Sequence, residues 1–469
     1  MAMELATHSW ISATPWCTAI LAALLLFLHR FHRRRYNLPP GPKPWPIIGN
    51  LNLISPLPHQ SLHTLSQKYG PIMHLRFGSK PVVVGSSVEM AKAFLKTHDA
   101  SFASRPKFSA GKYTTYNYSD ILWAPYGPYL SQARRLCFRH LLCPKALVSQ
   151  EYIREEENNT LLYKLFISAN TTILLKELLY DSNLNIISRM VLGKNEKFDR
   201  FLEHVLDEHN EKRKGVKDYV AKDMVDVLLQ VAEDPTLEVK LERDGVKGIT
   251  MDLILAGSQS SAIIVEWAIS ELLKNPMTLK KATEELDRVI GRQRWVKEED
   301  IAKLPYMEAI VKETMRLHPL APLITPRLAR YDCNVGGYDI PKGTIVLVNV
   351  WAISRDPSIW DNPNEFFPER FKDKTIDVKG HNFELLPFGA GRRACLGKNL
   401  GLKVVQSTLA NMVHGFSWRL PDNMKEEDLN MEEISLLTTS RKEPLVVVAE
   451  ARLPSHLYTA LGSSEVHFS

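Results

Sequence analysis

Polar and apolar residues follow two different periods along this chain, and each period predicts a different kind of element. Residues 71–85 alternate at a period of two on either side of a Gly-Ser-Lys turn, which predicts two short paired strands. Strand-like patterns return at 331–350 and 443–449. These segments predict small sheets at the periphery of the protein.

Most of the chain between 87 and 318 instead carries the spacing of helices. In the segment YMEAIVKETMRLHP, the apolar residues Met307, Ile310 and Val311 fall on one helical face, and Pro319 marks the end of the helix. Helix therefore dominates the centre. We expect a mainly α fold with small peripheral β-sheets, which is an α+β architecture.

The amino terminus has the pattern of a membrane anchor. No charged residue occurs from 10 to 28, a stretch of 19 residues, and a transmembrane helix needs about 20. Four arginines follow between 30 and 35, so the positive-inside rule predicts that the chain beyond them is cytoplasmic. We expect an uncleaved single-pass anchor in the endoplasmic reticulum membrane; a buried core helix is the alternative.

The anchor leads into a segment with five prolines between 39 and 46, a density that predicts a semi-rigid extended spacer. We therefore divide the chain into four parts. They are a membrane anchor (1–29), a basic and proline-rich hinge (30–50), one catalytic domain (51–454) and a C-terminal tail (455–469).

Composition and charge narrow the classes of function. With 45% hydrophobic and 24% charged residues, the chain has the composition of a folded globular protein. Its net charge of +6 comes largely from the four arginines between 30 and 35, which favours membrane lipid as a partner and argues against nucleic acid. The five cysteines form no CxxC pair, which argues against a disulfide framework, zinc or an iron-sulfur cluster.

The segment FGAGRRACLG at 388–397 is the strongest candidate for chemistry. Its glycines let the backbone turn tightly before Cys395 and point N–H groups at the sulfur. Gly397 leaves space for a flat macrocycle, and the start of the helix that follows favours thiolate over thiol. From these residues alone, Cys395 is either a reactive or metal-bound thiol or a buried cysteine beside a glycine turn.

This segment closely resembles the haem-binding signature of the cytochrome P450 monooxygenases, F-G-x-G-x-R-x-C-x-G. The resemblance covers most of the chain, and the quoted segments include LPPGPKPWPIIGN, Glu313-x-x-Arg316, Pro368-Glu369-Arg370-Phe371 and AGSQSS. The chain is similar to plant microsomal members, especially flavonoid 3'-hydroxylase-like and terpenoid-oxidising ones. The resemblance implies the triangular prism fold, one catalytic domain, and haem b with Cys395 as its axial thiolate ligand.

Several further residues acquire roles through the resemblance. Glu313 and Arg316 would on their own be a solvated ion pair on one helix, but the family joins them with Arg370 in a buried triad that supports the cysteine loop. Phe388 and Gly397 of the signature are expected to contact haem.

The family also implies which residues hold the haem propionates, namely Arg393, Arg134 and Arg327. Arginine suits carboxylates because its fork of donors is planar. Leu130 stands where the family has a tryptophan, so one propionate hydrogen bond is expected to be missing. A basic docking surface for a reductase, formed with Arg135, is the alternative role of Arg134.

The segment AGSQSS interrupts an apolar helical run and predicts a kinked helix over a pocket. The resemblance identifies it as the oxygen-activation segment, with Gly257, Gln259 and Ser260 as the site residues. Ser260 supplies the alcohol, but Gln259 occupies the position of an acid and cannot exchange a proton near neutral pH. Serine back-bonding in a structural kink is the alternative.

The chain is short where the family carries its lid. Roughly fifty residues normally separate two helices here, and only 194–197 intervene in this sequence. The lid region near 190–200 is therefore expected to be shortened, which would widen the pocket or uncouple oxygen consumption from product formation. A splice variant or a misassigned exon would give the same sequence.

The resemblance implies a monooxygenase that inserts one oxygen atom of O₂ into a small hydrophobic plant secondary metabolite, phenolic or terpenoid. Electrons are expected from NADPH, indirectly, through NADPH-cytochrome reductase as partner. Two other functions stay open. One is a catalytically impaired haem-binding paralogue, favoured by Leu130, Gln259 and the short lid. The other is a haem-thiolate isomerase or dehydratase that needs no external electrons.

Overall fold

The computed structural model describes residues 36–193 and 201–462, except Gly215, Lys217, Asp218, Asp373 and Asn423. The α-helices are α2 Pro58–Tyr69, α3 Val88–Lys92, α4 Ser109–Thr114, α5 Pro128–Cys137, α6 Pro144–Ser149, α7 Glu151–Ile167, α8 Leu175–Leu192, α9 Phe201–Arg213, α10 Met224–Ala232, α11 Arg243–Lys274, α12 Pro276–Val289, α13 Pro305–Leu317, α14 Val350–Ile353, α15 Lys398–Gly415 and α16 Ser455–Gly462. The strands are β1 Ile72–Phe77, β2 Lys80–Gly85, β3 Thr172–Leu174, β4 Arg327–Leu328, β5 Cys333–Val335, β6 Tyr338–Ile340, β7 Ile345–Val348, β8 Phe416–Arg419, β9 Glu433–Ser435, β10 Thr439–Arg441 and β11 Val446–Ala451.

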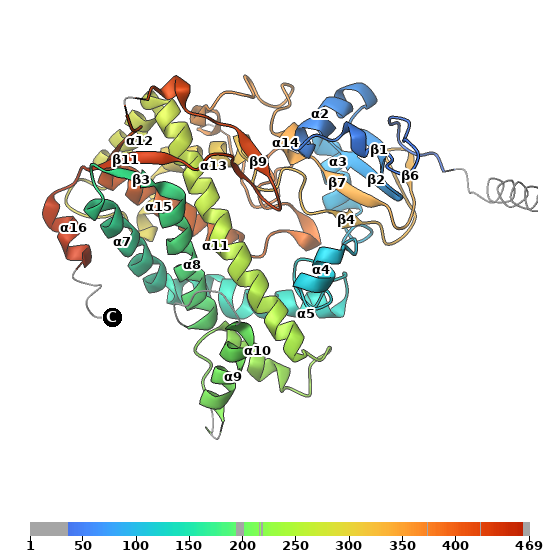
Figure 1. Ribbon diagram of the computed structural model, residues 1–469, viewed down its shortest axis with the longest axis horizontal. Coiled ribbons are helices and arrows are strands. Elements are labelled where there is room, and N and C mark those ends of the chain that lie inside the picture. The colour runs from blue at the N-terminus through green and yellow to red at the C-terminus, as the bar shows by residue number, and fades with distance from the viewer. Residues whose placement is uncertain are drawn as a thin grey trace, which may run out of the picture.

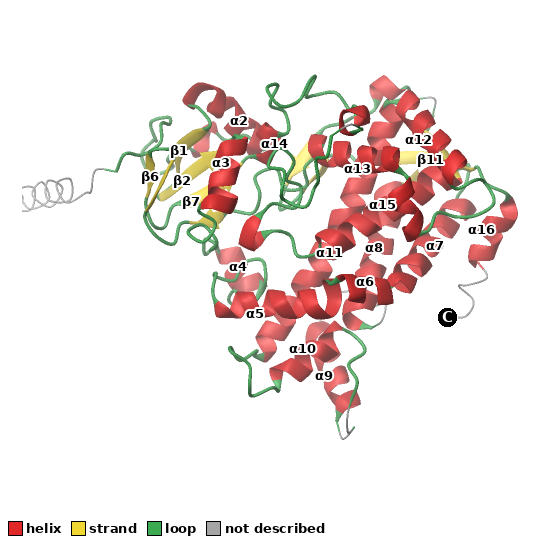
Figure 2. Ribbon diagram, turned by 180° about the vertical axis from the view of Figure 1, so that it is seen from behind, coloured by secondary structure: helices red, strands yellow, loops and turns green. Residues whose placement is uncertain are grey.

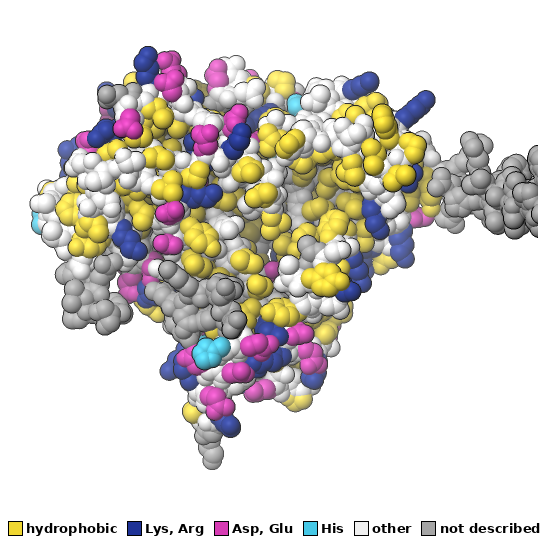
Figure 3. Space-filling view, in the orientation of Figure 1, with side chains coloured by type: hydrophobic (Ala, Val, Ile, Leu, Met, Phe, Trp, Pro, Cys, Tyr) yellow, Lys and Arg dark blue, Asp and Glu magenta, His cyan; other side chains and the backbone are white. Residues whose placement is uncertain are grey.

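The helices form the broad part of the molecule, and the largest sheet lies at the other side with α2 and α3 beside it (Figure 1). The outline narrows toward α9 and α10, so it is roughly triangular in this view. Charged side chains gather over this narrow end (Figure 3), where Arg243 and Lys247 of α11 both pair with Glu203 of α9. The expected mainly α fold with small peripheral sheets is confirmed.

The largest sheet has the strand order β1-β2-β7-β4. β1 and β2 form the expected antiparallel hairpin, with Leu75 opposite Val82. β2 runs parallel to β7, and β4 lies antiparallel to β7 with Arg327 opposite Val346. The sheet thus holds Arg327 beside strands from the beginning of the described chain. The smaller sheets are β3-β11-β8, β10-β9 and β5-β6.

Helix α11 is the centre of the helical part. Every residue from 261 to 273 is buried, as expected for a helix that is apolar on all sides within a large core. α8 lies alongside α11 in both ribbon views (Figures 1 and 2), and α13 and α15 also pack on α11. α11 therefore carries the AGSQSS segment through the middle of the fold.

The segments that flank the expected catalytic domain pack against it. We expected a tail from 455, but α16 packs into the core, where the ring of Tyr458 is fully buried and stacks on Phe166. We expected a spacer at 30–50, but its described part lies along the sheet, because His74 N donates to Pro40 O at 2.8 Å and Asn50 N donates to Arg76 O at 2.6 Å. Main-chain hydrogen bonds therefore join this proline-rich segment to β1.

The expected anchor at 1–29 lies outside the described residues. Within the part of the chain that the structure describes, α11 is the one helix with the length and hydropathy of a membrane span, and 61% of its most apolar window is buried inside the protein. Its burial identifies it as a core helix.

The packing of α16 leads to a prediction about Tyr458. Its hydroxyl donates to Gly415 O and accepts Arg452 N and Leu453 N, both at 3.0 Å. Tyr458→Phe leaves Leu453 N without its partner, while Arg452 N and Gly415 O keep their hydrogen bond to each other at 2.9 Å. We therefore expect the free energy of unfolding to fall by about 1–3 kcal/mol. Denaturant unfolding of the solubilised protein measures this, with the exposed Tyr152 changed to Phe as the control. Equal unfolding midpoints for the two variants would mean that α16 is not part of the core.

Candidate active site

A glycine turn delivers Cys395 to the start of α15. Gly389 and Gly391 have φ values of +63° and +73°, in the left-handed region that favours glycine. A Cβ atom on Gly391 would also lie 2.2 Å from Leu95 O, so no side chain fits there. The short 3₁₀ turn Gly391–Arg393 follows, and Cys395 N donates to Phe388 O at 2.9 Å. The turn leaves Cys395 three residues before Lys398, the first residue of α15.

The side chain of Cys395 is exposed to solvent, although protein atoms surround the thiol. Burial raises its pKa, while the N–H of Gly397 and the charges of Arg134 and Lys398 act in the opposite direction. A Cβ on Gly397 would meet no atom within 4 Å, so there is open space beside the sulfur. This arrangement can accept a flat group that the sulfur ligates.

The three arginines expected to hold propionates lie around the cysteine loop. Arg393 donates to Ala103 O at 2.7 Å and to Ala124 O at 2.5 Å. The other two bond to the loop itself: Arg134 Nη2 donates to Ala394 O and Arg327 Nη2 donates to Ala390 O, both at 2.8 Å. Their roles toward a cofactor stay predictions, but their side chains share one region.

A fourth arginine, Arg105, was missed by the sequence analysis. It is 5% exposed and donates to Leu122 O, Thr325 O and Pro326 O. Burial lowers its pKa, and the charges of Arg393, Arg327 and Arg134 lower it further. A single arginine in the otherwise apolar or small segment FASRP was the available signal.

These four arginines fit an anionic group. Burial and mutual repulsion lower the pKa of Arg393 to about 10, and Arg327 Nε is buried without a hydrogen-bond partner in the part of the chain described. The carboxylates that offset their charge here are Asp99, which accepts Arg327 Nη1 at 2.8 Å, and Asp120. A ligand with two carboxylates, such as haem, would supply the missing negative charge.

Glu313, Arg316 and Arg370 form a contiguous buried cluster. Glu313 is fully buried, and its carboxylate accepts Arg316 Nε at 2.7 Å and Arg370 Nε at 2.8 Å. The guanidinium of Arg316 also donates to Ser354 O at 2.6 Å and Pro363 O at 2.7 Å. Each charge is therefore hydrogen-bonded as well as paired, which a buried ion pair requires.

The AGSQSS segment is helical throughout, as part of α11, so no break in the helix accompanies its small residues. Ser260 Oγ donates to Ala256 O at 2.8 Å, which is the back-bonding alternative considered above. Gln259 is exposed, and its side chain bonds to none of the residues described. Leu255, Ala256 and Gln259 are exposed on one side of the helix.

Gly257 has a packing role in the structure. A Cβ at this position would lie 2.7 Å from Cγ1 of Ile187, so the absence of a side chain lets α8 approach α11. The close approach of the two helices accounts for glycine here, and the place of Gly257 in the oxygen-activation segment stays a prediction.

Two segments of apolar or small residues, 321–324 and 436–439, lie close to one another, and the first approaches the cysteine loop. Thr439 N donates to Leu320 O at 2.8 Å, which joins β10 to the chain after α13. A Cβ on Gly389 would lie 3.9 Å from Ile324. The neighbouring Leu436 and Leu437 are 78% and 72% exposed. Their apolar side chains are thus available to a hydrophobic ligand.

The connection between α8 and α9 is short. α8 ends at Leu192, Gly193 takes a left-handed conformation, and α9 begins at Phe201. The expected lid region overlaps 194–200, which lies outside the described residues. Only eight residues, 193–200, separate the two helices in the sequence.

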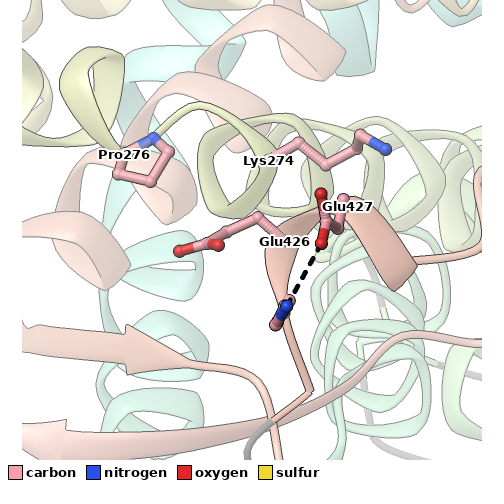
Figure 4. Close-up of a pocket in the computed structure, with 5 residues that line it drawn as sticks. Lys274, Pro276, Glu426 and Glu427 are labelled. Carbon is pink, nitrogen blue, oxygen red and sulfur yellow. Dashed lines mark ion pairs between the residues drawn. The ribbon is translucent and has the colours of Figure 1, made fainter.

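A surface pocket elsewhere is unrelated to this site. It is lined by Lys274, Pro276, Lys425, Glu426 and Glu427 (Figure 4), with an ion pair of 3.5 Å between Lys425 and Glu427. Lys274 ends α11, fifteen residues beyond Gln259, or about 22 Å along a helix. Its charged lining and its position exclude it as the pocket of Cys395.

Comparisons with known proteins identify relatives over nearly the whole chain. The family profile described as Cytochrome P450 matches residues 39–200 and 194–446. Trimethyltridecatetraene synthase of Zea mays is 42% identical over 96% of this chain and 95% of that protein. Flavonoid 3'-monooxygenase of Petunia hybrida is 41% identical over 94% of this chain and 98% of that protein.

A solved structure agrees with these relatives. The chain in "Zebra fish cytochrome P450 another structure with Abiraterone" superposes with a TM-score of 0.76 at 25% identity, over 85% of this chain and 100% of that one. Together the matches confirm the resemblance found in the sequence. The alignment with the maize protein spans 528 positions, more than the 469 residues of this chain, so the relative contains residues that this chain lacks. The two profile matches meet at 194–200, where the sequence predicts the lid to be short.

The buried triad gives a prediction for Arg316. Arg316→Ala leaves Glu313 with an uncompensated buried charge, so we expect the free energy of unfolding to fall by about 3–5 kcal/mol. The purified variant should also carry little haem. Denaturant unfolding and haem content measure these effects, with Arg292→Ala as the control because its pair with Asp287 is 56% exposed on the arginine side. A variant as stable as this control would contradict the structural role.

Proposed function

Because this chain belongs to the cytochrome P450 family, we propose that it is a membrane-anchored haem-thiolate monooxygenase of the endoplasmic reticulum. It inserts one oxygen atom of O₂ into a small hydrophobic plant metabolite. The other oxygen atom leaves as water, with two protons and with two electrons that NADPH-cytochrome reductase passes on from NADPH. The observation that supports this most is the accessible Cys395 surrounded by four buried or half-buried arginines.

The chain's own residues suit haem b. Cys395 would ligate the iron, and Arg393, Arg134, Arg327 and Arg105 would bind the two propionates. When bound, haem supplies the iron centre that activates O₂, and a thiolate ligand favours cleavage of the O–O bond. Phe388 and Gly397 lie at the two ends of the cysteine loop, where Gly397 leaves open space.

The oxygen-activation segment has no acidic side chain that could supply protons. Ser260 Oγ is committed to Ala256 O, although a hydroxyl can still accept a hydrogen bond. Gln259 can orient water through its amide but cannot release a proton near neutral pH. Proton transfer along α11 would therefore depend on water that Gln259 and Ser260 order.

The substrate is expected to be apolar, either phenolic or terpenoid. Two relatives of similar identity are named for different chemistries, a trimethyltridecatetraene synthase and a flavonoid 3'-monooxygenase. Ile324 lies near the cysteine loop, and Leu436 and Leu437 are exposed; these apolar side chains suit either class.

A catalytically impaired haem-binding paralogue is the second candidate. The maize relative contains residues that this chain lacks, and the family profile matches as two segments that overlap at 194–200. A lid normally excludes water and retains substrate, so a protein without it can bind haem and still fail to form product. NADPH-dependent oxygen consumption with product formation separates the two candidates.

The haem site is tested by the carbon monoxide difference spectrum of the reduced protein in microsomes. We expect the strongly red-shifted Soret band of a thiolate-ligated complex. Cys395→Ser should abolish it, whereas the control Cys143→Ser should retain it. A wild-type protein without this band would contradict the proposed haem site.

Gln259→Glu tests proton supply, because it places an acid where the chain has an amide. We expect the fraction of consumed O₂ that appears as product to rise severalfold once a substrate is known. Gln259→Leu is the matched control, since it offers neither a proton nor a hydrogen bond. Unchanged coupling in Gln259→Glu would show that proton supply is not the limiting defect.

A further inference from the structure

A carboxylate on α11 with no role in the proposed function holds a segment of main chain against that helix. Asp252 Oδ2 accepts Ile121 N and Leu122 N, each at 2.8 Å. Two successive amides on one carboxylate oxygen fix both the position and the orientation of this segment. Asp252 lies seven residues before Gln259, on the helix that crosses the site.

The opposite side of the same segment bonds to the arginines near Cys395. Ile121 O accepts Arg393 Nη1 at 3.2 Å, and Leu122 O accepts Arg105 Nε at 3.1 Å. The peptide group between 121 and 122 therefore has its carbonyl on Arg393 and its N–H on Asp252. This one peptide group therefore connects α11 to Arg393, which lies two residues before Cys395.

The segment also touches α11 one turn earlier. A Cβ on Gly248 would lie 2.3 Å from Ser119 O, so only glycine allows this approach. Tyr129 of α5 donates its hydroxyl to the same carbonyl at 2.8 Å. Residues 119–124 are thus held at two successive turns of α11, by close packing at Gly248 and by hydrogen bonds at Asp252.

A second carboxylate lies within this segment. Asp120 is fully buried and accepts Trp123 N at 3.0 Å. Burial raises the pKa of both carboxyls, and the charge of Asp120 helps to raise the pKa of Asp252 to about 7. The other titratable groups facing Asp252 are Tyr129 and Cys137 of α5, whose raised pKa values keep them neutral at pH 7.

The two arginines act from the far side of the segment. The charge of Asp120 raises the pKa values of Arg105 and Arg393 against the larger lowering by burial. Charge attraction therefore draws the segment toward the arginines, while Asp252 binds it to α11.

We propose that Asp252 is a positioning residue of the haem site, which clamps residues 119–124 onto α11 and so fixes the carbonyls that hold Arg393 and Arg105. This rests on the proposed function, because the site being positioned is that of Cys395. The two amide hydrogen bonds favour ionised Asp252, whereas burial and the charge of Asp120 oppose its ionisation more strongly. Ionisation of both carboxyls therefore loosens the clamp.

The direction of the pH effect follows from the raised pKa. The folded state binds a proton on Asp252 more tightly than the unfolded chain does, so the stability that this group contributes is present at low pH and is lost as pH rises toward 7. Asp252→Asn keeps an oxygen that accepts both amides and removes the ionisation. Asp252→Ala removes the acceptor as well.

Hydrogen exchange of the amides at 121 and 122, measured on the full chain in bilayers, tests the clamp. After correction for intrinsic rates, wild-type exchange should rise by up to about tenfold between pH 6 and pH 8. Asp252→Asn should show no such rise, and Asp252→Ala should exchange fast at both pH values. Asp244→Asn is the matched control, since Asp244 is an exposed aspartate on the same helix that pairs with Lys247, and it should behave as wild type. Slow exchange in Asp252→Ala would overturn the proposal.

The carbon monoxide spectrum then tests the link to the haem site. At pH 7, Asp252→Ala should retain a smaller fraction of the thiolate-ligated band than wild type, and Asp252→Asn should restore it. Fast exchange in Asp252→Ala with a full thiolate band would show a clamp that does not position the site, which also overturns the proposal. If wild type itself lacks the band, the proposed haem site fails, while hydrogen exchange still decides on the clamp.

Discussion

The carboxylate of Glu313 is the charge on which the rest of the site depends. It is fully buried, and it neutralises two arginines whose remaining donors bond to carbonyls between 354 and 365. A buried ion pair is not favourable by its charge alone, since desolvation opposes it; the additional hydrogen bonds make it tolerable. Through them, the segment 354–365 is fixed against α13, and the chain continues from it through 366–387 to the cysteine loop.

The surroundings of Cys395 show the opposite balance of charge. Arg393 and Arg105 are bound by main-chain carbonyls rather than by carboxylates, and Asp99 pairs with Arg327. Carbonyls orient a guanidinium without neutralising it, so the group stays electropositive and ready for an anion. Asp252 acts on these arginines through the main chain. The 119–124 segment is hydrogen-bonded to α11 on one side and to Arg393 and Arg105 on the other.

The shortened connection after α8 leaves this framework in place. α8 packs on α11 through Ile187 and Gly257, which lie on the two helices themselves and not in the connection. The residues of the buried triad and of the cysteine loop also lie outside this connection. On α11 itself, Leu255 is 50% exposed. Binding of a cofactor and productive use of oxygen are separate properties in such a chain.

The sequence by itself determined the elements and the local chemistry. The period of 71–85 gave the β1–β2 hairpin, Pro319 marked the end of α13, and the glycines around Cys395 gave its turn, because each depends on residues a few positions apart. Arg105, the Asp252 clamp and the packing of Gly257 appeared only in the tertiary structure. Arg393 bonds to Ala103 across 290 residues and to Ile121 across 272. No local period records such contacts, since they arise only when the complete core brings distant segments together.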